Sequence, residues 1–322
     1  MMERAKKIVL EAPAGYNFVI SQKGNGEVRI KLICVDTEYS ENYINPPIPE
    51  GWEHVEGEWD EGYVIQDSKG NQFVWIPVGF LDANGTLDGT KFYEKFGRRK
   101  YQYHEFSDDE FHQELEEELR KQCESVRHYG GFYISRYNIS KNQNTGEAQS
   151  VKGEMPWTNI DWNNAMKAAK TFGDGVSVRS HLPFGEEYDS TLEWFIESGE
   201  RTREEIEDNS KQWGNFWDTY NAPKEIVKTG TREDWFTKNI GDFAGNVDEW
   251  TQEEYEIGDR VIRGGNYGQC GEYYPVAERK TSDPSETYLD TGFRAALFLA
   301  QRWLLIQVQK EGETLKFQSL SF

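Results

Sequence analysis

Apolar and polar residues alternate along residues 16–35, and this alternation predicts a β-hairpin. Residues 23–26, Lys-Gly-Asn-Gly, lie between the two runs and are typical of a tight turn. A connector rich in Pro follows at residues 45–51 and indicates a boundary. Two interpretations of residues 1–50 stay open: a small attachment or docking element, or a strand pair packed on the main domain.

Apolar residues recur at three- and four-residue intervals in three later segments, which predicts helices over residues 108–128, 162–172 and 185–198. Gly130 and Gly173 follow the first two segments and are typical stop signals. Cys123 falls on the apolar stripe of the first helix, so we expect it to act as a small hydrophobic residue.

Short apolar runs predict strands at residues 63–65, 73–77 and 132–139. Residues 81–107 are polar and aromatic without a clear period, which predicts a long loop. Residues 297–322 predict two more strands around a Lys-Glu-Gly-Glu turn. The chain therefore mixes helices with short strands.

The composition narrows the possible partners. The net charge of −21 argues against nucleic acid and anionic membranes, because both would repel the protein. The first residues lack the apolar segment of a secretory signal peptide, and no apolar run is long enough to span a membrane. We expect a protein that is cytoplasmic when synthesised, and that can reach the outside as part of a particle such as a phage tail.

The reactive residues form no familiar metal or catalytic motif. The three cysteines, Cys34, Cys123 and Cys270, include no CxxC pair, which excludes a zinc ribbon and a disulfide scaffold. The five histidines are scattered, and there is no phosphate-binding loop or dinucleotide-binding glycine motif.

An ordered set of segments nevertheless resembles the formylglycine-generating enzyme (sulfatase-modifying factor) family. These segments are Phe73–Val78, Tyr129–Tyr137, Pro156–Ala165, Ser180–Pro183 with Glu186, Glu187 and Trp194, Gly245–Trp250, Arg263–Tyr267 and Gly292–Arg294. The resemblance implies an α+β, C-type-lectin-like fold over residues 51–322, with small twisted antiparallel sheets, flanking helices, extensive loops and a β extension after residue 296. Arg263 and Arg294 are then expected to pair with buried carboxylates or carbonyls.

Enzymes of the family are expected to bind copper through two cysteines between the Arg-Gly-Gly and Gly-Phe-Arg segments. This chain has only Cys270 in that interval, and Val276 stands where the second cysteine should fall. The iron-dependent relatives need a His triad that is absent here. We therefore expect neither copper nor iron, and Cys270 would be catalytic only in a divergent oxidase.

The resemblance also implies a possible calcium site in the Gly245–Trp250 turn. The matching ligands are Asn246, the carbonyl of Val247, and Glu249, and oxygen donors suit Ca²⁺. The alternative is that Asn246 and Glu249 satisfy amides of the turn.

Non-catalytic relatives of this fold, such as phage tropism determinants and the variable proteins of diversity-generating retroelements, display a ligand surface between the same two segments. Tyr and Asn are good contact residues, because they combine rigid area with adaptable hydrogen bonds. The candidate contact residues are Trp217, Asn266, Tyr267, Gln269, Glu272, Tyr273 and Tyr274.

The sequence thus favours a non-enzymatic module that binds a protein or glycan on another surface, as a phage or prophage tail component or a retroelement-diversified protein. Homo-oligomerisation or attachment to a larger particle would fit this role. Two alternatives stay open: a divergent copper oxidase acting on protein cysteine, and a structural virion protein.

Overall fold

The computed structural model describes residues 16–22, 28–34, 45–78, 110–254, 258–299, 306–311 and 314–319. The chain forms two compact units, one from residues 1–38 and 301–322 and the other from residues 39–300. Among the described residues, no helix has both the length and the apolar character needed to cross a bilayer. The loop expected at residues 81–107 lies outside the described residues.

The smaller unit contains two hairpins. β1 (Tyr16–Gln22) pairs antiparallel with β2 (Val28–Cys34), and β17 (Ile306–Glu311) pairs antiparallel with β18 (Thr314–Ser319). The apolar residues at positions 18 and 32 lie opposite each other in the first pair. The first pair was predicted from the alternation and the second as two strands around a Lys-Glu-Gly-Glu turn, whereas the proposed attachment role of residues 1–50 stays a prediction.

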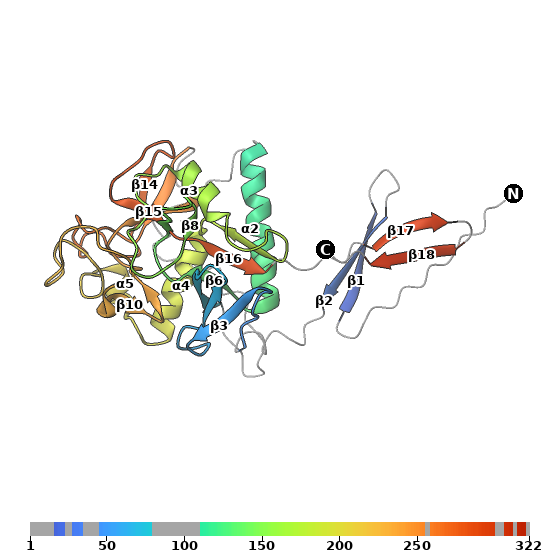
Figure 1. The fold of residues 1–322 in the computed structure, drawn as a ribbon, viewed down its shortest axis with the longest axis horizontal. Coiled ribbons are helices and arrows are strands. Elements are labelled where there is room, and N and C mark those ends of the chain that lie inside the picture. The colour runs from blue at the N-terminus through green and yellow to red at the C-terminus, as the bar shows by residue number, and fades with distance from the viewer. Residues whose placement is uncertain are drawn as a thin grey trace. The chain divides into compact units, whose positions relative to one another are not determined.

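The larger unit is organised around an antiparallel sheet of six strands in the order β3-β4-β5-β6-β16-β9. The strands are β3 (Trp52–Glu56), β4 (Val64–Asp67), β5 (Gln72–Pro77), β6 (Gly131–Ser135), β16 (Ala296–Leu299) and β9 (Val178–His181). β16 comes late in the chain but inserts between β6 and β9 (Figure 1). Strands from the beginning and from the end of the larger unit therefore belong to the same sheet.

A second sheet has the order β14-β13-β12-β15 and carries the residues of the candidate site. Its strands are β12 (Asp248–Glu254), β13 (Arg260–Arg263), β14 (Lys280–Ser282) and β15 (Thr291–Phe293). β12 and β15 are parallel, with Glu249 opposite Gly292. The Gly245–Trp250 and Gly292–Arg294 segments therefore lie side by side.

Two small strand pairs complete the β structure. β7 (Ser140–Lys141) pairs with β8 (Ala148–Gln149), and β10 (Phe236–Thr237) pairs with β11 (Ile240–Gly241). The turn between β10 and β11 holds Lys238 and Asn239 at φ 48° and 63°, as a tight hairpin of the I′ type requires. A 3₁₀ turn, η3 (Glu233–Trp235), precedes β10.

The described residues contain the helices α2 (Glu110–Tyr129), α3 (Trp162–Ala169), α4 (Gly185–Glu197) and α5 (Arg203–Glu207). α2 packs on β6 and β16 (Figure 1), α3 packs on β9 and β15, and α4 packs on β5 and β12. The first three were predicted, but α3 ends three residues early because the chain turns there and the Phe172 N–H donates to Ser180 Oγ of β9 at 3.0 Å.

Local capping explains where the helices begin. Asp161 Oδ1 accepts a hydrogen bond from the Asn164 N–H at 2.9 Å and caps α3. Glu187 Oε2 accepts the Phe184 N–H at 2.9 Å at the start of α4. Thr202 and Glu205 form a reciprocal capping box for α5, a short helix that the sequence analysis did not predict.

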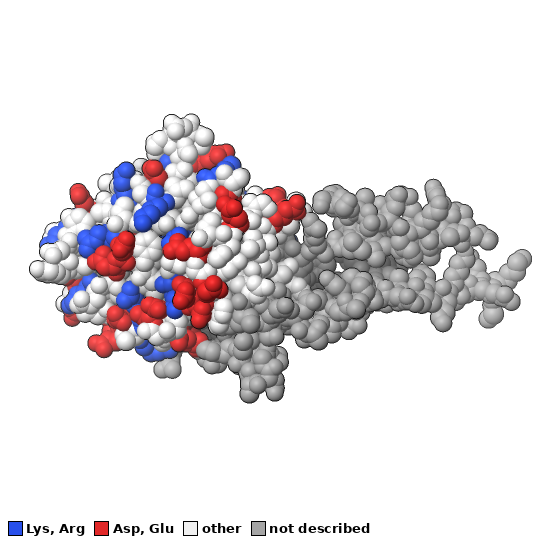
Figure 2. Space-filling view, turned by 60° about the horizontal axis from the view of Figure 1, so that its bottom comes forward, with Lys and Arg blue, Asp and Glu red and all other residues white. Residues whose placement is uncertain are grey.

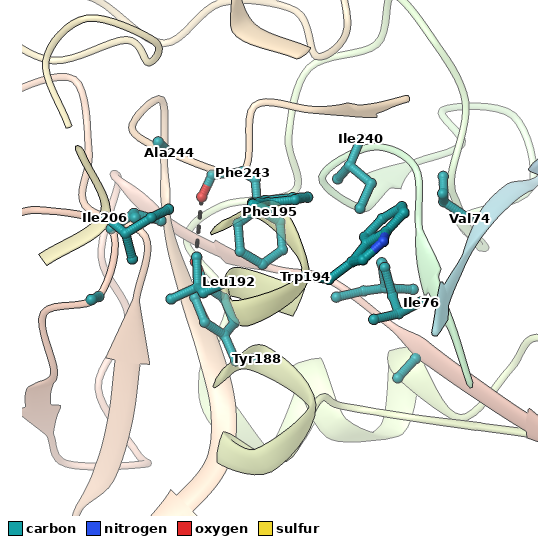
Figure 3. Packing of buried hydrophobic residues seen from close by; sticks show 14 of the residues in the cluster. Val74, Ile76, Tyr188, Leu192, Trp194, Phe195, Ile206, Ile240, Phe243 and Ala244 are labelled. Carbon is teal, nitrogen blue, oxygen red and sulfur yellow. Dashed lines mark hydrogen bonds between the residues drawn. The ribbon is translucent and has the colours of Figure 1, made fainter. Parts of the chain in front are cut away.

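Aromatic side chains fill much of the interior of the larger unit. Figure 3 shows one face of α4 packed against Phe243 and Ala244, with the Tyr188 hydroxyl donating to the Phe243 carbonyl at 3.3 Å. A second cluster contains Trp162, Trp250 and Phe293. The prediction of an α+β domain with small antiparallel sheets, flanking helices and long loops is confirmed.

Candidate recognition site

A buried ion pair fixes the base of the site. Arg294, at the end of β15, donates from Nε to Glu249 Oε1 of β12 at 2.6 Å, and both side chains are buried. Its other guanidinium nitrogens donate to the carbonyls of Ser135 at 3.1 Å and Gly241 at 2.5 Å. One side chain thus joins both sheets and the β11 strand, and the expected structural role of Arg294 is confirmed.

Arg263, at the end of β13, has a similar role. Both of its terminal nitrogens lie 3.1 Å from Asp189 Oδ1 of α4. Arg279 donates to the other oxygen of Asp189 at 2.6 Å and to Glu253 at 2.9 Å. This buried network ties α4 to the second sheet, so Arg263 also has the structural role expected of it.

The residues of the predicted calcium site are buried and already hydrogen-bonded. Asn246 Oδ1 accepts the Val227 N–H at 3.0 Å and the Asn215 amide at 3.2 Å. Glu249 Oε1 accepts from Asn138 at 2.6 Å in addition to Arg294. Calcium would have to displace these N–H donors, although Glu249 Oε2 is a buried oxygen without a hydrogen bond in the described part of the chain.

The surroundings of Glu249 also change its pKa. Burial raises the pKa of Glu249 to about 7, although the Arg294 guanidinium opposes the shift. Within the described residues, no group of three or more His, Cys, Asp or Glu side chains is arranged to hold a metal. The backbone of Val247 donates to the Gly245 carbonyl at 2.9 Å as part of the turn. Calcium binding by Asn246, Val247 and Glu249 stays a prediction.

The position that would supply a second copper ligand is apolar in this protein. Val276 is fully buried and belongs to the same core cluster as Trp213 and Phe216. Cys270 is partly exposed and forms no disulfide. The single thiol and the buried valine do not provide the paired thiolates of a Cu(I) site.

Two loops contact each other at the surface of the larger unit. The loop of residues 210–220 and the loop of residues 265–274 are joined by three hydrogen bonds: Ser210 N–H to the Gly271 carbonyl at 2.9 Å, Trp217 N–H to the Gln269 carbonyl at 2.8 Å, and Gly271 N–H to Asp218 Oδ1 at 2.8 Å. Phe216 and Tyr274 also leave no space for a side chain at Gly265, which has φ +74°. The two loops therefore form one connected structure.

Exposed aromatic side chains gather on these loops. Trp217 is 50% exposed, Tyr220 88%, Tyr273 73% and Tyr274 40%. We call these four residues the recognition surface. Lys224 lies over the Trp217 ring at 4.4 Å and restrains it. Such exposure of large rings on a hydrogen-bonded support is typical of a contact surface.

The other predicted contact residues differ in how far they are exposed to solvent. Tyr267 and Gln269 are half-buried, and Glu272 is exposed. The prediction that Asn266 is an exposed contact residue is wrong, because its side chain is buried. It donates to Asp248 at 2.6 Å and to Asp290 at 3.0 Å, and so it supports the loop from below. Tyr220, absent from the predicted contact residues, is the most exposed aromatic of the surface.

Charge is distributed evenly on the face of the larger unit shown in Figure 2. Acidic and basic side chains alternate there, with uncharged areas between them. That face therefore presents no single-sign patch, in spite of the net charge of −21.

Comparison with known proteins identifies a family. The family described as "Sulfatase-modifying factor enzyme 1-like domain" matches residues 65–298, well over half of the chain. No curated protein matches the chain.

Three solved structures are similar to parts of it. Treponema denticola variable protein 1 is 17% identical and is matched over 52% of this chain and 84% of its own, with a TM-score of 0.38. PvdO from Pseudomonas aeruginosa is 16% identical over 73% and 98%, with a TM-score of 0.45. CarF is 14% identical over 71% and 98%, with a TM-score of 0.41.

Proposed function

The chain belongs to the sulfatase-modifying factor enzyme 1-like domain family, and we propose that it is a non-enzymatic member that recognises a protein or glycan ligand. The observation that carries the proposal is the recognition surface. Its four exposed rings lie on two loops that three hydrogen bonds join to each other. A rigid support lowers the entropy lost on binding and so favours affinity.

A binding experiment with matched variants tests the proposal. Wild-type protein and the double variant Trp217→Ala/Tyr273→Ala are applied to glycan and peptide arrays. Exposed aromatic anchors contribute about 2 kcal/mol or more each, so we expect the double variant to lose the ligands that the wild type retains. Val176→Ala is the control, because Val176 is 61% exposed but belongs to neither loop.

The oxidase alternative has a separate test. Cys270 lies in the 265–274 loop and is partly exposed, so a lone-thiol reaction would occur beside the recognition surface. We expect protein supplied with Cu(I) to show no oxygen uptake on a cysteine-containing peptide. Sustained turnover that Cys270→Ser abolishes would overturn the non-enzymatic assignment.

We further propose that the protein is displayed on a larger particle, such as a phage tail, through its N-terminal hairpin. β1 and β2 belong to a unit distinct from the domain that carries the recognition surface. Deleting residues 1–50 should abolish attachment and preserve array binding. Unchanged attachment would remove this part of the proposal.

A further inference from the structure

Lys280 and Asp248 form a pair that differs from the other lysine–carboxylate pairs of the described residues. Lys280, the first residue of β14, donates from Nζ to Oδ1 of Asp248, the first residue of β12. The side chain of Asp248 is 3% exposed and that of Lys280 is 18% exposed. In the other lysine–carboxylate pairs that the structure describes, the carboxylates are 18–57% exposed. Asp248 is therefore the lysine-bound carboxylate from which water is most excluded.

Amide side chains of the 265–274 loop hold both members of this pair. Asn266 Nδ2 donates to Asp248 Oδ2 at 2.6 Å, and it also donates to Asp290 Oδ2 at 3.0 Å. Gln269 Oε1 accepts a second hydrogen bond from Lys280 Nζ at 3.0 Å. The Lys280 nitrogen thus lies against one oxygen of the Asp248 carboxyl group, while an N–H donor lies against the other oxygen.

An amine and a carboxyl group held in this way are arranged for condensation. Contact between two reacting groups removes most of the entropy cost of bringing them together, and this cost is a large part of the barrier in solution. An N–H donor on the second oxygen stabilises the negative charge that develops there when the carbon is attacked. Exclusion of water favours the amide over its hydrolysis, because water is the other product.

We propose that Lys280 and Asp248 condense to an intramolecular isopeptide bond between Nζ and Cγ. A proton passes from the Lys280 ammonium to Asp248 Oδ1 along their hydrogen bond, and the Nζ electron pair then attacks Cγ. A second Nζ proton passes to Oδ1, the Cγ–Oδ1 bond breaks, and one water leaves. The step needs no oxidant and no other reactant. Asn266 stabilises the charge on Oδ2 during the attack.

The bond closes a covalent ring over residues 248–280, which contains the whole 265–274 loop. Asn266 and Gln269 of that loop contact the two side chains that the bond joins. A cross-link restricts the unfolded chain as a disulfide does, so this bond stabilises the folded loop. The condensation requires no ligand, and the proposal is therefore independent of the proposed function.

Mass spectrometry of the full chain under denaturing conditions tests the proposal. The wild-type mass should be lower by one water than the mass of its sequence. Trypsin should release a branched peptide in which residues 239–260 are joined to residues 280–294, without cleavage after Lys280. Lys280→Arg keeps a cation beside Asp248 but replaces the amine by a guanidinium, so its mass should equal that of its sequence.

Lys238→Arg is the matched control. Lys238 Nζ pairs at 3.2 Å with Glu200, whose side chain is 48% exposed, so this variant should keep the loss of one water and the branched peptide. The proposal would be overturned by a wild-type chain with the full mass of its sequence, or by a loss of one water that persists in Lys280→Arg. The wild-type digest decides the question even where a variant does not fold, and array binding does not affect either mass.

Discussion

Replacing Arg294 with Met removes a buried cation that joins the two sheets and β11. The change keeps an unbranched apolar stem but deletes the guanidinium that contacts Glu249, Ser135 and Gly241. Glu249 is left buried without its cationic partner. Breaking a buried pair in this way costs about 3–5 kcal/mol, a large part of the about 5–15 kcal/mol that stabilises a typical domain.

The loss should depend on pH in a definite direction. The folded-state pKa of Glu249 is about 7, above its ordinary value of 4.5, so its contribution to the free energy of unfolding falls as pH rises through this window. Arg294 lowers that pKa, so its removal raises the pKa further. The deficit of the Arg294→Met variant should therefore be smaller at pH 5 than at pH 8, because protonation neutralises the unpaired carboxylate.

Urea unfolding followed by tryptophan fluorescence measures both effects. Ten of the eleven tryptophans lie within residues 39–300, and only Trp303 lies outside, so the signal reports the larger unit. Glu249→Gln is the matched partner, and the double variant should lose less than the sum of the two single losses. A loss for Arg294→Met below about 1 kcal/mol, or a loss that is equal at pH 5 and pH 8, would refute this reasoning.

Three further predictions concern the same domain. Gly265→Ala places a Cβ 2.5 Å from a Phe216 ring carbon at a residue with φ +74°, so it should destabilise the folded protein by about 1–3 kcal/mol and weaken array binding. Gly268→Ala, whose Cβ would have its nearest contact at 3.4 Å, should do neither. Equal melting temperatures of the two variants would contradict this prediction. Burial lowers the pKa of His181, but Glu187 at 2.8 Å outweighs burial and raises the pKa above 6.5. The stabilisation of the folded state by the pair of protonated His181 and Glu187 is complete below pH 6.5 and is lost as pH rises through the folded-state pKa of His181. The difference in the free energy of unfolding between wild type and Glu187→Gln, about 1.5–3 kcal/mol, should therefore be larger at pH 6 than at pH 9. Thermal unfolding measures it, and a difference that is constant with pH would count against this prediction. Of the two interpretations of the Gly245–Trp250 turn, the structure favours the one without calcium, because N–H donors occupy Asn246 and Arg294 occupies Glu249. Calcium added after chelation should then leave the melting temperature unchanged, and a rise that Asn246→Ala abolishes would instead establish the calcium site.

Local patterns in the sequence were enough to predict α2, α3 and α4, the strand pairs of the smaller unit and the family framework. The stripe of α2 and the alternation of β1 and β2 are properties of neighbouring residues. The position of β16 between β6 and β9 was not predicted, because that pairing joins segments more than one hundred residues apart.

In the 265–274 loop, residue type alone led to a wrong prediction of which side chains are exposed. Asn266 has the amide expected of a contact residue, yet it is buried between Asp248 and Asp290. Asp248 could have indicated this burial, because a carboxylate next to the Gly-Asn-Val turn needs a hydrogen-bond donor from another segment. It accepts hydrogen bonds from both Asn266 and Lys280. Burial of a polar residue depends on such distant partners and cannot be predicted from its own segment.

Array binding by wild type, Trp217→Ala/Tyr273→Ala and Val176→Ala tests the central claim most directly. The claim predicts that wild type and Val176→Ala retain a shared set of glycan or peptide ligands and that the double variant loses it. The assignment of the recognition surface would be contradicted if the double variant, folded by circular dichroism, kept the same ligands with unchanged signal.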